Sequence, residues 1–167
     1  LQRAPDTYAH HGPFFYANCT YPYGMKPLPL VWFAADAVEL APRLLGKIVR
    51  RGSCAGVIVE TEAYTTDAAS HARKMTPRSE LIHSTYGHWY VYFTYGMHWC
   101  ANVTTNKDVA GAVLIRAVEP TEGIAVMRRR RGIATLHGLC SGPAKFCEAF
   151  GITGKENGAL IGSDFAL

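Results

Sequence analysis

The sequence predicts one α+β domain built on a curved, mainly antiparallel sheet with peripheral helices. Strand-like segments gather in the middle of the chain and helix-like segments lie toward its ends, an order that fits α+β better than alternating βαβ units. The chain has 167 residues, of which 49% are hydrophobic. This is enough for one packed core and too short for two domains of ordinary size, and we find no internal repeat or linker.

A first helix is expected from about residue 37. Asp36 followed by Glu39 has the pattern of a capping box, and apolar residues continue until Gly46 ends the segment. Pro42 lies inside this segment and must remove one backbone hydrogen bond, which predicts a kink or a late start.

The central strands are predicted from their β-branched and aromatic residues. Residues 57–64 and 112–118 each read as one strand, whereas 89–95 and 98–104 form a hairpin with Tyr95 and Gly96 near its tip. In a regular strand over 57–64, alternate positions share a face. One face would then carry two carboxylates and a phenol: Ile58, Glu60, Glu62 and Tyr64.

Two further helices are expected in the last third of the chain. They cover residues 122–131 and 143–150, and Gly132 and Gly151 end them. The first carries four consecutive arginines, Arg128–Arg131, which must point in several directions. We therefore expect a partly solvated face, from which one or two arginines could reach phosphates.

Composition narrows the function classes only moderately. The longest apolar stretches, such as residues 110–117, are far below the roughly 20 residues that span a bilayer. A net charge of +4 permits a polyanionic partner but does not argue for one alone. The 5 cysteines include no Cys-x-x-Cys pair, so we expect buried free thiols in a reducing cytosol.

Characteristic blocks follow one another along the chain: VETEAY (59–64), SH (70–71), TPR (76–78), YVYFTYGM (90–97), CANV (100–103), LIRAVEP (114–120) and LCSGPAK (139–145). Together they resemble the alkyladenine (3-methyladenine) DNA glycosylase family over about residues 30–151. Several blocks in the right order are far more specific than one short motif. The resemblance implies a methylpurine-DNA glycosylase domain over 30–167. Residues 1–29 would be an N-terminal extension that is partly disordered. Because the family continues into further strand-like sequence, truncation at the C-terminal end is also expected.

The resemblance implies a monofunctional DNA N-glycosylase of base excision repair. Such an enzyme flips alkylated or deaminated purines (3-methyladenine, 7-methylguanine, hypoxanthine, ethenoadenine) out of duplex DNA and leaves an abasic site. It implies no metal and no organic cofactor. The expected partner is duplex DNA with damaged purines, bound by a monomer with no membrane association. The expected location is the cytoplasm (nucleoid) in a bacterium or the nucleus in a eukaryote.

Two residues match the catalytic positions of that family. Glu62 matches the general base, because hydrolysis passes through an oxocarbenium-like sugar that a carboxylate can stabilise while it activates water. Arg116 matches the arginine that positions this water. Without the resemblance, Glu62 would read as an exposed strand glutamate and Arg116 as a solvent-facing arginine. Glu60 could be structural or simply exposed.

Four residues match the pocket for the extruded base. Tyr64 and Tyr92 would supply aromatic faces for a cationic purine, and His71 a hydrogen-bonding wall. Asn102 would crowd the exocyclic amine of guanine and so disfavour normal guanine. The alternatives are core packing for the tyrosines, a surface loop for His71 and, for Asn102, a strand or turn side chain that bonds its own backbone.

The remaining matches concern the DNA duplex. Tyr95 matches the wedge that fills the gap left by the flipped nucleotide, and Met97 could support it or simply pack. Ser141, Gly142 and Lys145 open a helix whose amides could hold a backbone phosphate, although the same residues are also an ordinary helix start.

Two other functions compete with this interpretation. The first is a DNA-binding module that keeps the pocket but has lost turnover. The second is a metal-dependent hydrolase that uses carboxylates with His71, His83 and His88, although these histidines have no recognisable ligand spacing.

Overall fold

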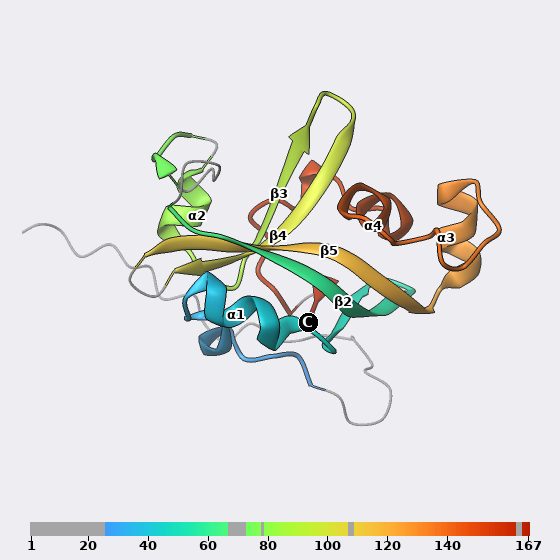
Figure 1. Cartoon of the computed structure of the whole chain (residues 1–167), viewed down its shortest axis with the longest axis horizontal. Coiled ribbons are helices and arrows are strands. Elements are labelled where there is room, and N and C mark those ends of the chain that lie inside the picture. Colours follow the sequence, from blue (N-terminus) through green and yellow to red (C-terminus); the bar gives the residue numbers. More distant parts are fainter. Residues whose placement is uncertain (1–25, 67–72, 78, 107–108, 163–164) are drawn as a thin grey trace, which may run out of the picture.

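The structure is a computed structural model that describes residues 26–66, 73–77, 79–106, 109–162 and 165–167 (Figure 1). The predicted extension over residues 1–29 lies almost wholly outside these ranges. No helix among the described residues is long and apolar enough to cross a membrane.

One antiparallel sheet organises the described chain. Its strand order is β3-β4-β5-β2-β1-β6, and each neighbouring pair is antiparallel, which confirms the predicted α+β class. In Figure 1 the long strands β2 and β5 cross the middle of the molecule as a twisted ribbon, and the β3–β4 hairpin stands away from it. The strands are β1 (Ile48–Arg51), β2 (Cys54–Tyr64), β3 (Trp89–Thr94), β4 (His98–Asn106), β5 (Ala110–Glu122) and β6 (Phe165–Ala166).

Helices cover the sheet at its periphery. The helix α1 packs on β2 and β5, whereas α4 packs on β4 and β5 and lies beside α3 (Figure 1). The short α2 also contacts β4 and β5. The helices are α1 (Ala37–Leu44), α2 (Glu80–Ser84), α3 (Ile124–Arg131) and α4 (Pro143–Phe150), with 3₁₀ turns η2 (Leu30–Phe33) and η4 (Gly154–Glu156).

A side-chain cap explains where α1 begins. Asp36 is the N-cap, and its Oδ1 accepts from the Val38 amide at 2.7 Å. The bond comes from Val38 rather than Glu39, so Asp36 caps the helix without the reciprocal box that the sequence suggested. The helix ends at Leu44, and Pro42 lies inside it.

The boundary between β5 and α3 differs from the expectation. The predicted strand 112–118 extends over Ala110–Glu122, so α3 starts at Ile124 instead of residue 122. Glu122 pairs with Ala55 across the β2–β5 ladder and forms an ion pair with Arg50. Gly123, at φ 72°, makes the turn into the helix. Strand pairing and this ion pair therefore outweigh the helical preference of a glutamate.

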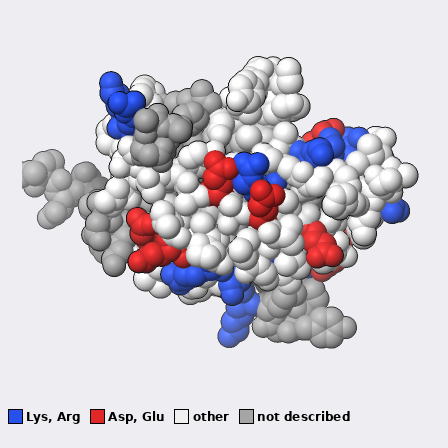
Figure 2. Space-filling model, in the orientation of Figure 1, with Lys and Arg blue, Asp and Glu red and all other residues white. Residues whose placement is uncertain are grey.

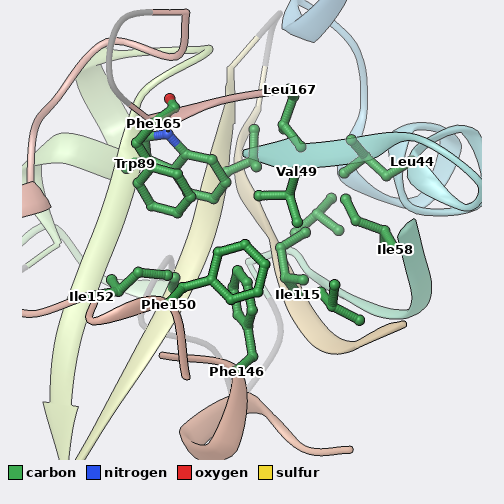
Figure 3. Close-up of a cluster of buried hydrophobic side chains, with 14 of the residues drawn as sticks. Leu44, Val49, Ile58, Trp89, Ile115, Phe146, Phe150, Ile152, Phe165 and Leu167 are labelled. Carbon is green, nitrogen blue, oxygen red and sulfur yellow. Dashed lines mark hydrogen bonds between the residues drawn. The ribbon is translucent and has the colours of Figure 1, made fainter. Parts of the chain in front are cut away.

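An aromatic stack closes the core across the two edges of the sheet. Trp89 of β3 lies flat on Phe165 of β6, with ring centroids 3.6 Å apart, and the indole N–H donates to the Phe165 carbonyl oxygen at 2.9 Å. Because β3 and β6 are at opposite ends of the strand order, this contact requires the sheet to curl. Figure 3 shows the enclosed apolar cluster, which includes Leu44, Val49, Ile58, Ile115, Phe146 and Phe150.

The cysteines have the expected form where they are described. Cys54, Cys100, Cys140 and Cys147 are free and buried. Burial raises the pKa of Cys140 to about 12, so this thiol stays protonated and unreactive at neutral pH. Cys19 lies outside the described residues.

Phe165→Ala should destabilise the fold strongly. The substitution removes the partner of Trp89 and leaves a cavity between the sheet edges, a change that typically costs about 3–5 kcal/mol. Chemical denaturation followed by circular dichroism would measure it. Phe93→Ala, at a ring that is 44% exposed, is the matched control and should cost much less. If both variants lost the same free energy of unfolding, the Trp89–Phe165 stack would not be what keeps the two sheet edges together.

Candidate active site

The β2–β5 ladder is locally irregular where the polar residues gather. Ile58 pairs with Val118 and Thr61 with Ile115, but between them Glu60 pairs with Ala117 and not with Arg116. Ile58 and Val118 lie in the core, as do Ile115 and Val113 farther along β5. Both strands therefore change the face they turn to the core within this short irregular segment.

This irregularity corrects one expectation. A regular strand would have put Ile58 on the same face as Glu60, Glu62 and Tyr64. Instead Ile58 is fully buried, whereas Glu60 is exposed. One irregular step in β2 thus frees the carboxylates from the core face, and sequence alternation alone could not reveal it.

Glu60, Glu62 and Arg116 form one ion-paired cluster. The Arg116 Nε–H donates to Glu60 Oε1 at 3.0 Å, and its Nη1–H donates to Glu62 Oε2. These bonds, that to Glu62 first, raise the pKa of Arg116. Figure 2 shows acidic and basic side chains side by side at the centre of the face over β2 and β5. Exposed ion pairs of this kind contribute about 0–1 kcal/mol to folding, so stability alone does not account for the cluster.

Two tyrosines line the same region. Burial raises the pKa of Tyr64 to about 12, and a hydrogen bond between its hydroxyl and Glu62 adds to the shift. Burial also raises the pKa of Tyr92, which is hydrogen-bonded to Cys100. Both phenols therefore stay neutral at physiological pH. Through its bond to Glu62, Tyr64 belongs to the same cluster as the two carboxylates.

Asn102 is buried in β4, between β3 and β5. It pairs with Tyr90 on one side and Leu114 on the other, and Leu114 in turn pairs with Glu62. Its Nδ2 donates to the Tyr90 carbonyl oxygen at 3.1 Å, which fixes the amide. Asn102 thus bonds the backbone of the neighbouring strand rather than its own, and it lies two strands away from Glu62. His71 lies outside the described residues.

Tyr95 occupies the tip of the β3–β4 hairpin in an unfavourable conformation. Its φ is 50°, and it is the only non-glycine residue with positive φ among the described residues. Gly96 follows at φ 67°, and the Met97 amide donates to the Thr94 carbonyl oxygen at 3.1 Å, as in a type I′ turn. The side chain is 90% exposed. The hairpin tip thus carries an exposed aromatic ring on a backbone conformation that non-glycine residues rarely adopt.

Met97 follows the hairpin tip and lies next to α4. It is exposed, and with Trp99, Ala144, Cys147 and other residues it lines a groove of about 420 Å³ between the hairpin and that helix. Trp99 contacts Phe93 across the hairpin at 4.7 Å between ring centroids. Met97 therefore faces open space beside the hairpin rather than packing in the core.

The start of α4 is open to solvent. Gly142 is its N-cap without a side-chain cap bond, and Pro143 follows at the first helical position. Lys145 Nζ donates to Ser141 Oγ at 3.2 Å. The helix therefore presents amides and an ammonium group close together. This arrangement fits a phosphate-binding helix start and an ordinary helix start equally well.

The arginine run of α3 divides into two pairs. Arg130 donates to the Ala149 carbonyl oxygen at 2.9 Å, and Arg131 forms an ion pair with Glu148, so both tie α3 to α4. Arg128 and Arg129 are exposed and have no partner within the described ranges. Two of the four arginines thus join α3 to α4, a division that four identical letters could not indicate.

The described residues include no group of three or more His, Cys, Asp or Glu side chains that could hold a metal ion. His83 lies in α2 and His88 forms an isolated bridge with Leu160. The metal-dependent alternative thus has no described ligand set in its support.

Comparison with known proteins identifies the family. The sequence profile of methylpurine-DNA glycosylase (MPG) matches residues 31–167. The chain belongs to the methylpurine-DNA glycosylase family. A protein of Rhodopseudomonas palustris (strain CGA009) is 48% identical over 148 residues, which cover 86% of this chain and 72% of the relative. One of Agrobacterium fabrum is 48% identical over 136 residues, covering 80% and 69%, and one of Bradyrhizobium diazoefficiens is 47% identical over 135, covering 79% and 68%.

All three relatives carry 3-methyladenine DNA glycosylase in their names. The chain is therefore an enzyme of the 3-methyladenine DNA glycosylase type, a hydrolase of N-glycosyl bonds in DNA repair. The resemblance found in the sequence blocks is confirmed.

The sequence did not predict two contacts of the site. These are the contact of Cys100 with Tyr92 and the bond of Glu60 to Arg116, and only the even spacing of Glu60 and Glu62 hinted at the second.

Tyr95→Gly should leave the fold as stable as before or stabilise it by up to about 1 kcal/mol. A left-handed non-glycine residue costs about 1–2 kcal/mol, partly offset by the roughly 0.5–1 kcal/mol of chain entropy that glycine adds. Thermal unfolding would measure the difference. Thr94→Gly, one residue earlier in β3, is the control and should destabilise. If both variants lose stability equally, the Tyr95 ring supports the fold.

Proposed function

We propose that this glycosylase flips alkylated or deaminated purine nucleotides out of duplex DNA and cleaves their glycosidic bond with Glu62 as general base. The observation that carries the proposal is the Glu62 carboxylate, held on an exposed sheet face between the Arg116 guanidinium and the Tyr64 hydroxyl. A carboxylate held in this way can act on a sugar that approaches from solvent. The product is an abasic site, because the base activates water and supplies no amine nucleophile.

The proposed reaction is a displacement by water. Water oxygen bonds to C1′, its proton passes to Glu62, and the glycosidic bond breaks with its electron pair leaving on the purine. Arg116 uses Nε and Nη1 for the two carboxylates, and its Nη2 has no partner within the described part of the chain, so it can hold the water. The negative carboxylates also favour the cationic sugar.

The proposed base pocket uses the neutral phenols of Tyr64 and Tyr92. Their raised pKa values support aromatic faces without negative charge, and a cationic 3-methyladenine gains stacking and cation–π attraction there. By family resemblance His71 is the hydrogen-bonding wall. Asn102, whose amide is fixed by the Tyr90 carbonyl oxygen, would disfavour normal guanine. By the family resemblance we assign 3-methyladenine, 7-methylguanine, hypoxanthine and ethenoadenine as the substrate class.

The proposed duplex contacts lie around the hairpin. Tyr95 is the wedge, with Met97 beside it, because the exposed, strained tip suits insertion into a base stack. Ser141, Gly142 and Lys145 at the start of α4 are proposed phosphate contacts, together with the exposed Arg128 and Arg129.

Glu62→Gln should abolish most excision while binding survives. The amide keeps size and hydrogen bonding but loses the base and the charge, and loss of a general base alone typically costs about 10²- to 10⁴-fold. Single-turnover release of methylated purines from methylated duplex DNA would measure the rate, and a gel-shift assay the binding. Excision within about tenfold of the parent would refute this assignment. A parent chain that binds but never excises would support the binding-module alternative.

Tyr95→Ser should weaken binding to lesion DNA more than binding to undamaged DNA. The wedge stabilises only the flipped state, whereas phosphate contacts serve both duplexes. Fluorescence anisotropy with methylated and unmethylated duplexes at one fixed salt concentration would compare the two affinities. Met97→Ser serves as the neighbouring control and should have the smaller effect. If Tyr95→Ser weakens both duplexes equally, Tyr95 is not a wedge.

A further inference from the structure

We propose that Glu60 is a positioning residue that acts through Arg116. Its carboxylate accepts from Nε of the guanidinium, so that Arg116 bonds to two carboxylates instead of binding Glu62 through two N–H groups. The inference rests on the proposed roles of Glu62 and Arg116. No role for Glu60 follows from the family resemblance of the sequence.

The geometry of the guanidinium carries the first step. Arginine commonly meets one carboxylate through two parallel N–H bonds. Here Nε–H goes to Glu60 Oε1 at 3.0 Å and Nη1–H goes to Glu62 Oε2, so each carboxylate takes one bond. Glu62 thus keeps capacity to accept from water, and Nη2 stays available to orient that water.

The sheet explains why this split arrangement is possible. Glu60 and Arg116 occupy the irregular segment of the β2–β5 ladder, at the point where both strands change the face they turn to the core. Irregularities of this kind re-aim side chains and are frequent beside active sites. In a strand that continued regularly from the buried Ile58, the Glu60 side chain would face the core and could not reach Arg116.

Exposure argues against a purely structural role. The Glu60 side chain is 58% exposed and that of Arg116 is 39% exposed. Water can therefore solvate both charges, and neither needs an ionic partner for the protein to fold. With Glu60 removed, nothing else among the described residues anchors Nε, and the guanidinium can rotate to bind Glu62 through two N–H groups. Such a shift moves the water-holding donor, and misplacement by about 1 Å can cost up to 10²-fold in rate.

The test is a double-mutant cycle on single-turnover release of methylated purines from methylated duplex DNA. Glu60→Ala should lower the excision rate about tenfold, within the range that misplacement produces. Binding and the thermal midpoint should stay close to the parent values, because Glu60 touches neither the core nor the proposed pocket. In the Arg116→Gln background, Glu60→Ala should add less than about twofold, since the group it positions is gone. Glu60→Asp, which keeps the charge, should recover part of the rate.

Controls separate this inference from the proposed function. Glu119→Ala removes an exposed β5 carboxylate that lies outside the cluster and should leave excision unchanged. If Glu62→Gln is as active as the parent, or the parent releases no methylated purine, the proposed function fails and this inference with it. If Glu62→Gln is inactive while Glu60→Ala matches the parent, only the inference is overturned. An equal cost of Glu60→Ala with and without Arg116 would overturn it as well. Should Glu60→Ala unfold, Glu60→Gln tests the same coupling to Arg116 with a smaller expected loss of rate, because glutamine loses the charge but can still accept from Nε.

Discussion

The pairing of β2 with β5 is the constraint on which the rest of the molecule depends. These long strands lie in the middle of the sheet, so they contribute to the core on one side and to the polar cluster on the other. Their ladder keeps one register from Ile58–Val118 to Tyr64–Ala112 except around Glu60 and Arg116. Because alternate residues of a regular strand share a face, this local irregularity is what lets Glu60 point away from the core although Ile58, two residues earlier, is buried in it.

The sheet curls around the apolar core and leaves the polar cluster on its exposed side. Trp89 on Phe165 joins the two edge strands, and α1 and α4 fill the concavity with leucine and phenylalanine side chains. The polar residues of the site therefore rest on a rigid scaffold that does not need them for its own stability. The proposed catalytic carboxylate can therefore stay accessible to DNA without weakening the core.

Basic residues show the same division between structure and binding. Arg130 and Arg131 hold α3 to α4, and Arg130 does so at the carbonyl end of α4, where a positive charge is favoured by the helix dipole. Arg128 and Arg129 remain on the surface. A modest net charge of +4 therefore still leaves unpaired cations where a polyanion could approach.

The sequence by itself determined the fold class, the central strands, the hairpin with its tip at Tyr95 and Gly96, and the family. These follow from local composition, turn residues and the order of short blocks, which need no knowledge of distant contacts. The position of Asp36 as N-cap was readable for the same reason. Only the tertiary structure decided that β5 runs on to Glu122, that Glu60 shares Arg116 with Glu62, and that two of the four arginines serve packing. Each of these depends on a partner that lies far away in the chain, and a pattern of alternation cannot show where a ladder becomes irregular.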